Sequence, residues 1–210
     1  MGARRMAAVD AQFYWMSAKV PSDEFLLYAF DGEPADLVRA LDAVRRRADA
    51  CSELRLRVAD GCSLTYPQWV PTTVTPEQVV HHELADRGWH ACLAAVAGLY
   101  AGQLDLRRLP WRLHVFTPVL GIPGVDGPGV VAVLQAPHAL ADGIRGAALA
   151  AWLFGRSAPV PGVHPPAPGP FAWRGRPGGM EPSPAGPRYA GGAAGTGSRH
   201  AATALHQHAP

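Results

Sequence analysis

The sequence predicts a mixed α/β domain, an α+β sandwich with a sheet and helices packed in layers, followed by a tail. Short apolar segments bounded by turn residues have the composition of buried strands, and longer segments repeat apolar residues at helical spacing. Composition changes sharply near Gly155, since residues 158–210 hold 11 Pro and 10 Gly in 53 residues. We therefore expect residues 1–157 to fold and residues 158–210 to form a disordered Pro/Gly-rich tail.

Four segments are expected to be strands. The runs at 24–30, 113–119 and 130–135 are short and largely apolar, as in buried strands, and a Gly/Pro loop at 121–129 precedes the third. Residues 54–58 (LRLRV) alternate apolar and basic side chains instead. That alternation is typical of a strand with one buried face.

Three segments are expected to be helices. The segment 34–49 repeats apolar residues on one helical face, and Pro34 suits its first turn. The segment 89–100 repeats large apolar residues and is followed by a glycine, and 143–154 consists largely of small residues. Thr-Pro-Glu at 75–77 is also typical of a helix start.

Overall charge and hydropathy argue against a nucleic-acid partner and against a membrane-spanning segment. The chain has 19 basic and 17 acidic residues and a net charge of +2, so no nucleic-acid footprint is expected. No apolar run reaches the ~18 residues that cross a membrane, and no signal-peptide core follows the N-terminus. Cys51, Cys62 and Cys92 cannot all pair and none lies in a CxxC motif, which favours a reduced, cytoplasmic protein.

Histidines at 81 and 82, with His90 nearby, form the pattern most similar to a metal site. Adjacent side chains point apart on a helix or a strand, and no Cys or acidic residue stands at ligand spacing. We therefore expect this segment to be a solvated loop and expect no metal.

The sharpest chemical signal lies at 135–143 (QAPHALADG), where an apolar strand ends and a helix begins. His138 lies in the turn, and a neutral imidazole there can take a proton from a hydroxyl or an amine near pH 7. Asp142 could orient the loop or cap the following helix, and Gly143 permits backbone angles that other residues avoid. The spacing alone leaves open a purely structural histidine, hydrogen-bonded at the surface.

Segment 137–143 resembles the HHxxxDG motif of acyltransferases related to chloramphenicol acetyltransferase, and most closely that of the wax ester synthase/diacylglycerol acyltransferase family. Three further segments are similar to that family in order and separation: 8–13 (AVDAQF) to its SPxDxxF opening, 52–57 (SELRLR) to its PxLRxR strand, and 103–113 (QLDLRRLPWRL) to its LDxxxPLWxL signature, with Leu and Pro exchanged. The resemblance covers about residues 6–156.

The resemblance implies the N-terminal lobe of a two-lobed, chloramphenicol acetyltransferase-like α/β fold, with the active site in a tunnel between the lobes. His138 would be the general base that takes the proton of an acceptor hydroxyl, which then attacks an acyl-CoA thioester. Asp142 would hold the loop and Gly143 would let it turn. Acyl-CoA would be a co-substrate, and no cofactor or metal is implied. The expected product is a wax ester or triacylglycerol.

The chain departs from the family pattern in two ways. Pro137 stands where the motif has its first His, and a proline there restricts Ala136. Family members are also much longer, and here the Pro/Gly-rich tail takes the place of the second lobe. We therefore expect a truncated form, from a shortened or frameshifted gene.

Two alternatives stay open. The chain could be a non-catalytic half-domain that binds a complementary lobe, a second copy of itself or a lipid surface. It could also be a condensation-type domain that forms amides on carrier-bound substrates. The resemblance implies a cytoplasmic location, with peripheral contact to the inner membrane face or to lipid inclusions.

Overall fold

A computed structural model describes residues 2–61, 65–156, 159–163 and 202–204 of the 210-residue chain. The chain divides into one unit of residues 1–164 with 201–210 and another of residues 165–200. The second unit lies outside the described residues, as does most of the predicted tail.

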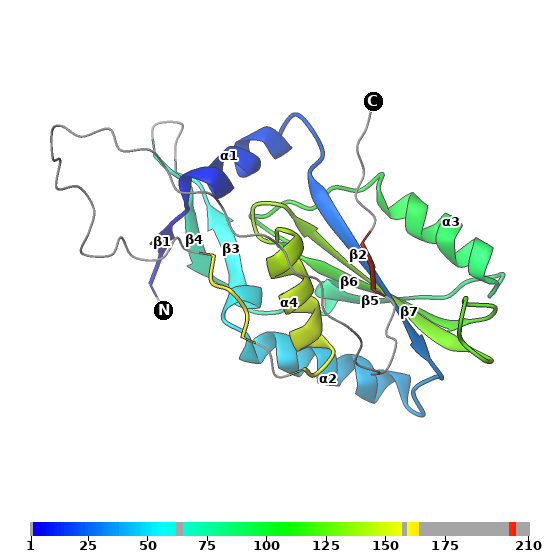
Figure 1. Cartoon of the computed structure of the whole chain (residues 1–210). Helices are drawn as coiled ribbons and strands as arrows, with labels where there is room; N and C mark the ends of the chain where they lie inside the picture. Colours follow the sequence, from blue (N-terminus) through cyan, green and yellow to red (C-terminus); the bar gives the residue numbers. More distant parts are fainter. Residues whose placement is uncertain (1, 62–64, 157–158, 164–201, 205–210) are drawn as a thin grey trace, which may run out of the picture. The chain divides into compact units, whose positions relative to one another are not determined.

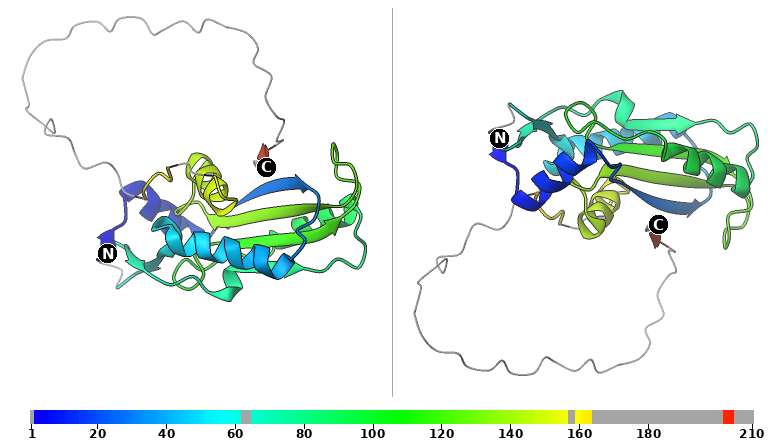
Figure 2. Two further views of the ribbon diagram at one scale, coloured as in Figure 1. Left: turned by 90° about the horizontal axis from the view of Figure 1, so that it is seen from below. Right: turned by 90° about the horizontal axis from the view of Figure 1, so that it is seen from above.

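The described residues form two sheets. The five-stranded sheet has the order β5 (Val79–His82), β6 (Arg112–Val119), β7 (Gly129–Pro137), β2 (Asp23–Asp31) and β8 (Ala202–Ala204). Its neighbours are antiparallel except for β5 and β6, which are parallel. The three-stranded sheet has the order β1 (Arg4–Arg5), β4 (Gln68–Pro71) and β3 (Leu56–Ala59) and lies at one end of the larger sheet (Figures 1 and 2).

The helices are α1 (Ala8–Ser17), α2 (Leu37–Ala50), α3 (Trp89–Leu99) and α4 (Gly143–Leu153), with the short 3₁₀ helices η1 (Glu53–Arg55) and η2 (Pro76–Gln78). Figure 1 shows α2 and α4 close together at one side of the strands and α3 at the other. The mixed α/β class predicted from the sequence is confirmed.

Helices α2 and α4 cover one face of the five-stranded sheet. Alternate side chains of β2, β6 and β7 point to this face, among them Leu26, Leu113 and Leu134, which share a core with Leu149 of α4. Helix α4 comes close to β2 at Gly146, where an added Cβ would lie 2.8 Å from the Leu26 side chain. The small residues of α4 therefore allow the helix to approach the sheet closely.

Helix α3 covers the opposite face. Phe25, Phe116 and Val133 alternate with the previous set along their strands and share a second core with Cys92 and Val96 of α3. Because both faces are covered, β2, β6 and β7 need apolar residues at nearly every position. This is why the sequence predicts these three strands at nearly their observed positions.

The start of α2 differs from the prediction. The helix begins at Leu37 because the Asp36 carboxylate caps it, accepting a hydrogen bond from the Arg39 amide at 2.9 Å. Pro34 precedes the helix and does not occupy its first turn.

Three short segments also differ. Only the second half of 54–58 is a strand, since Leu54 lies in η1 and β3 begins at Leu56, where pairing with β4 starts. The predicted helix at 75–77 is the single turn η2, in which the Thr75 amide donates to the Gln78 side-chain oxygen at 2.9 Å. The loop expected at 81–82 is wrong, because these residues end β5, paired with β6.

The packed chain continues past the predicted boundary at 157. Val163 is buried in the core, and its amide donates to the Glu53 carboxylate at 3.2 Å. Of the remaining tail the structure describes only 159–162 and β8, which pairs with β2.

Candidate active site

His138 lies between two elements that fix its backbone. Strand β7 ends at Pro137, and α4 begins at Gly143. The His138 amide donates to the Ser22 carbonyl at 3.0 Å, which extends the β7–β2 pairing by one hydrogen bond. The imidazole is 29% exposed, so it can reach a substrate and still be held by neighbours.

Two side chains from distant segments contact the imidazole. Its Nδ1 is hydrogen-bonded to Oε1 of Glu24, on β2. The ring of Phe13, on α1, packs against it with centroids 4.0 Å apart and planes tilted by 53°. The sequence resemblance includes Phe13 but gives it no role, and nothing local to the 135–143 segment indicates Glu24.

Glu24 reaches His138 through the register of two strands. Glu24 lies opposite Ala136 in the antiparallel β2–β7 pair. His138 follows Ala136 by two residues and therefore projects from the same face. The two side chains are diagonal neighbours, within reach of one another.

Asp142 lies at the N-terminal end of α4. Its carboxylate accepts the Arg145 amide at 2.7 Å and caps α4. Gly143 differs from the expectation: it is the first helical residue, its φ is not positive, and an added Cβ would meet no atom within 4 Å. The fold therefore does not need a glycine there for backbone freedom. Pro137 is buried at the end of β7, and its carbonyl accepts amides of the following turn.

A buried carboxyl group lies near this turn. Asp10, on α1, is 6% exposed, and burial is the main reason that its pKa is raised, with a further contribution from Asp142. Arg145 and His138 act in the opposite direction and lower it. The segment 8–13 thus brings Asp10 and Phe13 near His138 of the segment 137–143.

The other face of the same strands carries a row of polar side chains, of which His114 and Gln135 are buried and Asp23 and His82 half-buried. His82 Nε2 lies 2.9 Å from His114 Nδ1, and His114 Nε2 lies 3.0 Å from the amide oxygen of Gln135. Gln135 in turn donates to the Asp23 carboxylate at 2.7 Å. The row crosses four neighbouring strands. It is separate from the His138 cluster, by which we mean His138, Glu24, Phe13 and Asp10.

Burial controls the protonation of this row. It lowers the pKa of His114 to about 4 and also lowers the pKa of His82. It raises the pKa of Asp23, against the hydrogen bonds from Leu104 and Gln135. The two histidines are therefore neutral at pH 7, and each can donate only one hydrogen bond along the row.

The remaining predicted segments have structural roles. Trp111, from the 103–113 segment, is fully buried and donates from Nε1 to the Leu54 carbonyl at 2.9 Å. Cys92 is in the core, as predicted, and Cys51 is also buried, whereas Cys62 lies outside the described residues. Within the described part of the chain, no cluster of three or more His, Cys, Asp or Glu side chains could hold a metal ion.

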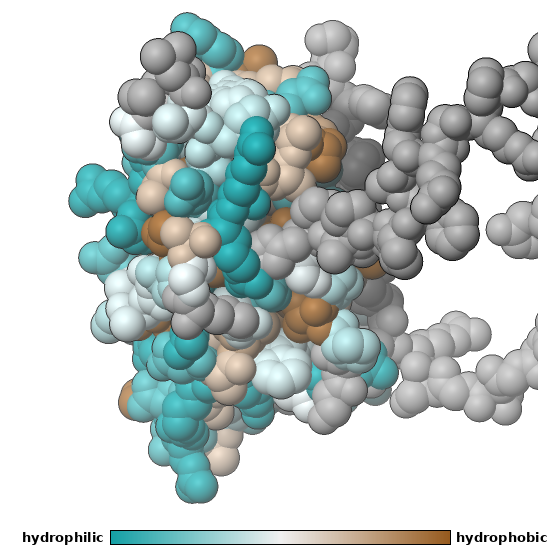
Figure 3. Space-filling model, turned by 90° about the vertical axis from the view of Figure 1, so that its left-hand side faces the viewer, coloured by the Kyte–Doolittle hydropathy of each residue, from teal (hydrophilic) through white to brown (hydrophobic). Residues whose placement is uncertain are grey.

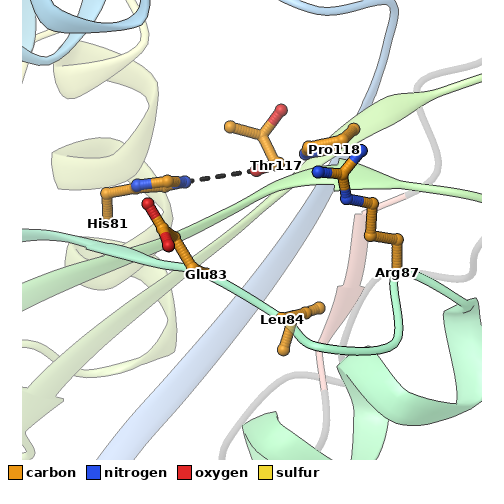
Figure 4. Close-up of a pocket in the computed structure, with 6 residues that line it drawn as sticks. All are labelled: His81, Glu83, Leu84, Arg87, Thr117 and Pro118. Carbon is orange, nitrogen blue, oxygen red and sulfur yellow. Dashed lines mark hydrogen bonds between the residues drawn. The ribbon is translucent and has the colours of Figure 1, made fainter.

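A pocket of about 310 Å³ lies elsewhere, where β5 and β6 end. Figure 4 shows its lining, with the imidazole of His81 bonded to the Thr117 carbonyl at 3.2 Å. The lining side chains are His81, Glu83, Leu84, Arg87, Thr117 and Pro118, and none of them belongs to the His138 cluster. The pocket therefore supplies no group to that cluster.

Comparison with known proteins defines the class of fold first. The chain is similar to a wax ester synthase/diacylglycerol acyltransferase from Marinobacter aquaeolei, with 20% identity, a TM-score of 0.53, and coverage of 67% of this chain and 35% of that one. It is also similar to a tallysomycin biosynthesis protein (20% identity, TM-score 0.56, 74% and 38% covered). A starter condensation domain of rhizomide synthetase is similar too (12% identity, TM-score 0.60, 73% and 36% covered). The fold is that of one lobe of the chloramphenicol acetyltransferase-like proteins.

The family is shown by sequence. Residues 6–178 match the wax ester synthase/diacylglycerol acyltransferase catalytic domain. The chain therefore belongs to that family, and the resemblance stated from its motifs is confirmed. No curated protein matches the chain. The chain spans little more than a third of the length of the solved structures named above.

Proposed function

We propose that this protein transfers a fatty acyl group from acyl-CoA to the hydroxyl of an alcohol or a diacylglycerol, with His138 as the general base. The observation that carries the proposal is the position of His138. In a chain that matches this acyltransferase family, it stands at the second His of the signature, partly exposed at the junction of β7 and α4.

The chemistry needs one group that can hold and return a proton. The neutral imidazole takes the proton of the acceptor hydroxyl as its oxygen attacks the thioester carbonyl carbon. The carbon–sulfur bond then breaks, the ester forms, and the imidazolium returns the proton to the sulfur of CoA. No oxidant, metal or covalent enzyme intermediate is needed for this sequence.

Asp142 and Pro137 hold the loop in this proposal. The cap at Asp142 fixes the start of α4, and Pro137 ends β7 one residue before the base. Pro137 replaces a histidine of the signature, so the whole of the proton transfer rests on His138.

The test is release of free CoA thiol by the purified chain, supplied with a long-chain acyl-CoA and a long-chain alcohol or diacylglycerol. We expect His138→Ala to lower the rate about 100-fold or more, the usual effect of losing a general base. His90→Ala is the matched control, because His90 is an exposed histidine on α3. An unchanged rate in His138→Ala, with an unchanged circular dichroism spectrum, overturns the assignment of the base.

A second candidate is amide formation on an amine acceptor. Several similar solved structures are condensation domains, one of them in a complex with C8-CoA and a second ligand. Supplying amine and hydroxyl acceptors together and weighing the products separates the two reactions. If neither acceptor yields product, both proposals fail, and the hypothesis of a binding domain for a partner lobe or a second copy is the one supported.

We also propose a cytoplasmic protein in peripheral contact with the inner membrane face or with lipid inclusions, where its acceptors and products would collect. Within the described residues, no helix is long and apolar enough to cross a bilayer. Val9, Trp15 and Met16 of α1 are exposed apolar side chains that could enter a lipid surface. Figure 3, the end of the molecule where α1 and the three-stranded sheet lie, shows apolar areas interrupted by hydrophilic ones. Vesicle flotation with and without Trp15→Ser tests the contact.

A further inference from the structure

We propose that Glu24 is a positioning residue that holds His138 in one tautomer, with the proton on Nδ1 and the lone pair on Nε2. The consequence for catalysis rests on the proposed acyl transfer, but the tautomer is a property of the chain itself. Nothing in the signature at 137–143 assigns such a partner to the histidine.

The first argument is the chemistry of the contact. A neutral imidazole carries one N–H, which can be on either nitrogen, and an ionised carboxylate can only accept hydrogen bonds. The contact joins Nδ1 of His138 to Oε1 of Glu24, so the proton must be on Nδ1 for the bond to form. Nε2 is then the nitrogen that can accept a proton from an acceptor hydroxyl.

The second argument is that the imidazole is held on more than one side. Glu24 contacts Nδ1, and the Phe13 ring packs against the imidazole at 4.0 Å. The backbone of His138 is bonded to Ser22, two residues before Glu24. The segment 22–24, at the start of β2, therefore holds both the main chain and the side chain of His138, and rotation of the ring would break its contacts with Glu24 and Phe13.

The third argument is electrostatic. Proton transfer gives the imidazole a positive charge, which a carboxylate bonded to it stabilises. The Glu24 side chain is only 19% exposed, so water screens this pair less than it would a surface pair. The other charged groups near the turn are Asp10, Asp142 and Arg145; Asp142 is committed to the helix cap, and Arg145 donates to the Leu140 carbonyl at 3.0 Å.

The first experiment observes the tautomer without any assay of activity. Protein labelled with ¹⁵N-histidine is examined by two-bond ¹H–¹⁵N correlation at alkaline pH, and the His138 signals are assigned by their absence from His138→Ala. We expect the Nδ1–H tautomer in the wild type. We expect Glu24→Ala and Glu24→Leu to shift His138 to the Nε2–H tautomer that predominates in free histidine. Glu24→Leu keeps the volume of the side chain, so it guards against a packing defect in Glu24→Ala.

The second experiment measures the rate of acyl transfer in the same variants. We expect kcat to fall by about tenfold or more, with KM within about twofold, because the base is misoriented while substrate binding is kept. Glu83→Ala is the matched control, since Glu83 is an exposed glutamate far from the His138 cluster in the contacts shown.

The outcomes separate this inference from the proposed function. An Nε2–H tautomer in the wild type, or an Nδ1–H tautomer that survives in both Glu24 variants, overturns the positioning role. A shifted tautomer with an unchanged kcat overturns its importance for catalysis. A shifted tautomer in a wild type that transfers no acyl group supports the Glu24–His138 contact and counts against the proposed function alone.

Discussion

Acid is expected to destabilise the fold through His114. This side chain is 3% exposed and bonded on both sides, to His82 at 2.9 Å and to Gln135 at 3.0 Å. Burial lowers its pKa to about 4, against the opposing effect of the hydrogen bond to Gln135. Protonating the ring would bury a cation that has no anionic partner in direct contact. It would also break the hydrogen bond that His114 Nδ1 accepts from His82 Nε2.

The size of the effect follows from proton linkage. An unfolded histidine has a pKa of about 6.5. As the pH falls, the unfolded state binds this proton first, so the folded state loses stability from about pH 6.5 down to about pH 4. Between pH 7 and pH 5 this loss is about 2 kcal/mol for a pKa difference of the size given by burial.

Other buried groups must be separated from this effect. The pKa of His82 is also lowered by burial, so it acts in the same direction as His114. The pKa values of Asp10 and Asp23 are raised by burial. Their folded states bind a proton before the unfolded chain does, so they add stability as the pH falls. The contribution of His114 to the pH dependence of stability is therefore measured as the difference between the wild type and a variant that lacks this histidine.

The assay is urea unfolding at pH 5, 6 and 7 of the wild type, His114→Leu and His90→Ala. We expect His114→Leu to be less stable at pH 7, because Gln135 loses its donor, but to lose about 2 kcal/mol less than the wild type between pH 7 and pH 5. His90→Ala should follow the wild type, since His90 is exposed. Parallel curves for the wild type and His114→Leu would refute the assignment of the acid sensitivity to this buried ring.

Two further predictions concern α4. Asp142→Ala removes the cap and should lower the free energy of unfolding by about 1 kcal/mol, whereas Asp142→Asn should cost much less; equal stability of the two variants in urea would contradict the capping role. Gly143→Ala should be neutral or should stabilise the fold by up to about 1 kcal/mol, because its Cβ meets open space. Gly155→Ala should destabilise the fold by about 1 kcal/mol, because Gly155 has a φ of +87°. Thermal unfolding of both glycine variants checks the contrast, and a loss of stability only in Gly143→Ala would be the opposite of the expected result.

The elements that the sequence predicts well are those whose burial leaves a complete pattern. Strands β2, β6 and β7 are covered on both faces, so their apolar runs are nearly continuous. Helices α3 and α4 begin at the predicted residues, Trp89 and Gly143. In each case the signal is contained within the segment itself.

The elements that the sequence does not predict depend on partners. Strand β5 is four residues long and ends in two histidines, so no local pattern separates it from a loop. It is a strand because it pairs with β6, and His82 is tolerated there because His114 bonds to it. Strands β1 and β4 are also too short for a local pattern to identify them. They are strands because β1 pairs with β4 and β4 pairs with β3.

The candidate site divides along the same line. His138 and Asp142 belong to one short sequence motif, and the structure places both between the end of β7 and the start of α4. Glu24 is 114 residues from His138 in the chain and meets it only because β2 and β7 pair in one register. Gly143 shows the opposite error, since the motif suggests a conformational need that the observed backbone does not have.

The register of β2 links the two polar clusters of the molecule. Asp23 and Glu24 are adjacent, so their side chains point to opposite faces of the sheet. Asp23 bonds to Gln135 in the polar row, and Glu24 bonds to His138 at the candidate active site. A slip of β2 by one residue would turn each of these carboxylates to the opposite face of the sheet, away from its present partner. The bond from Gln135 to Asp23 therefore helps to keep Glu24 within reach of His138, although the polar row itself touches no part of the candidate site.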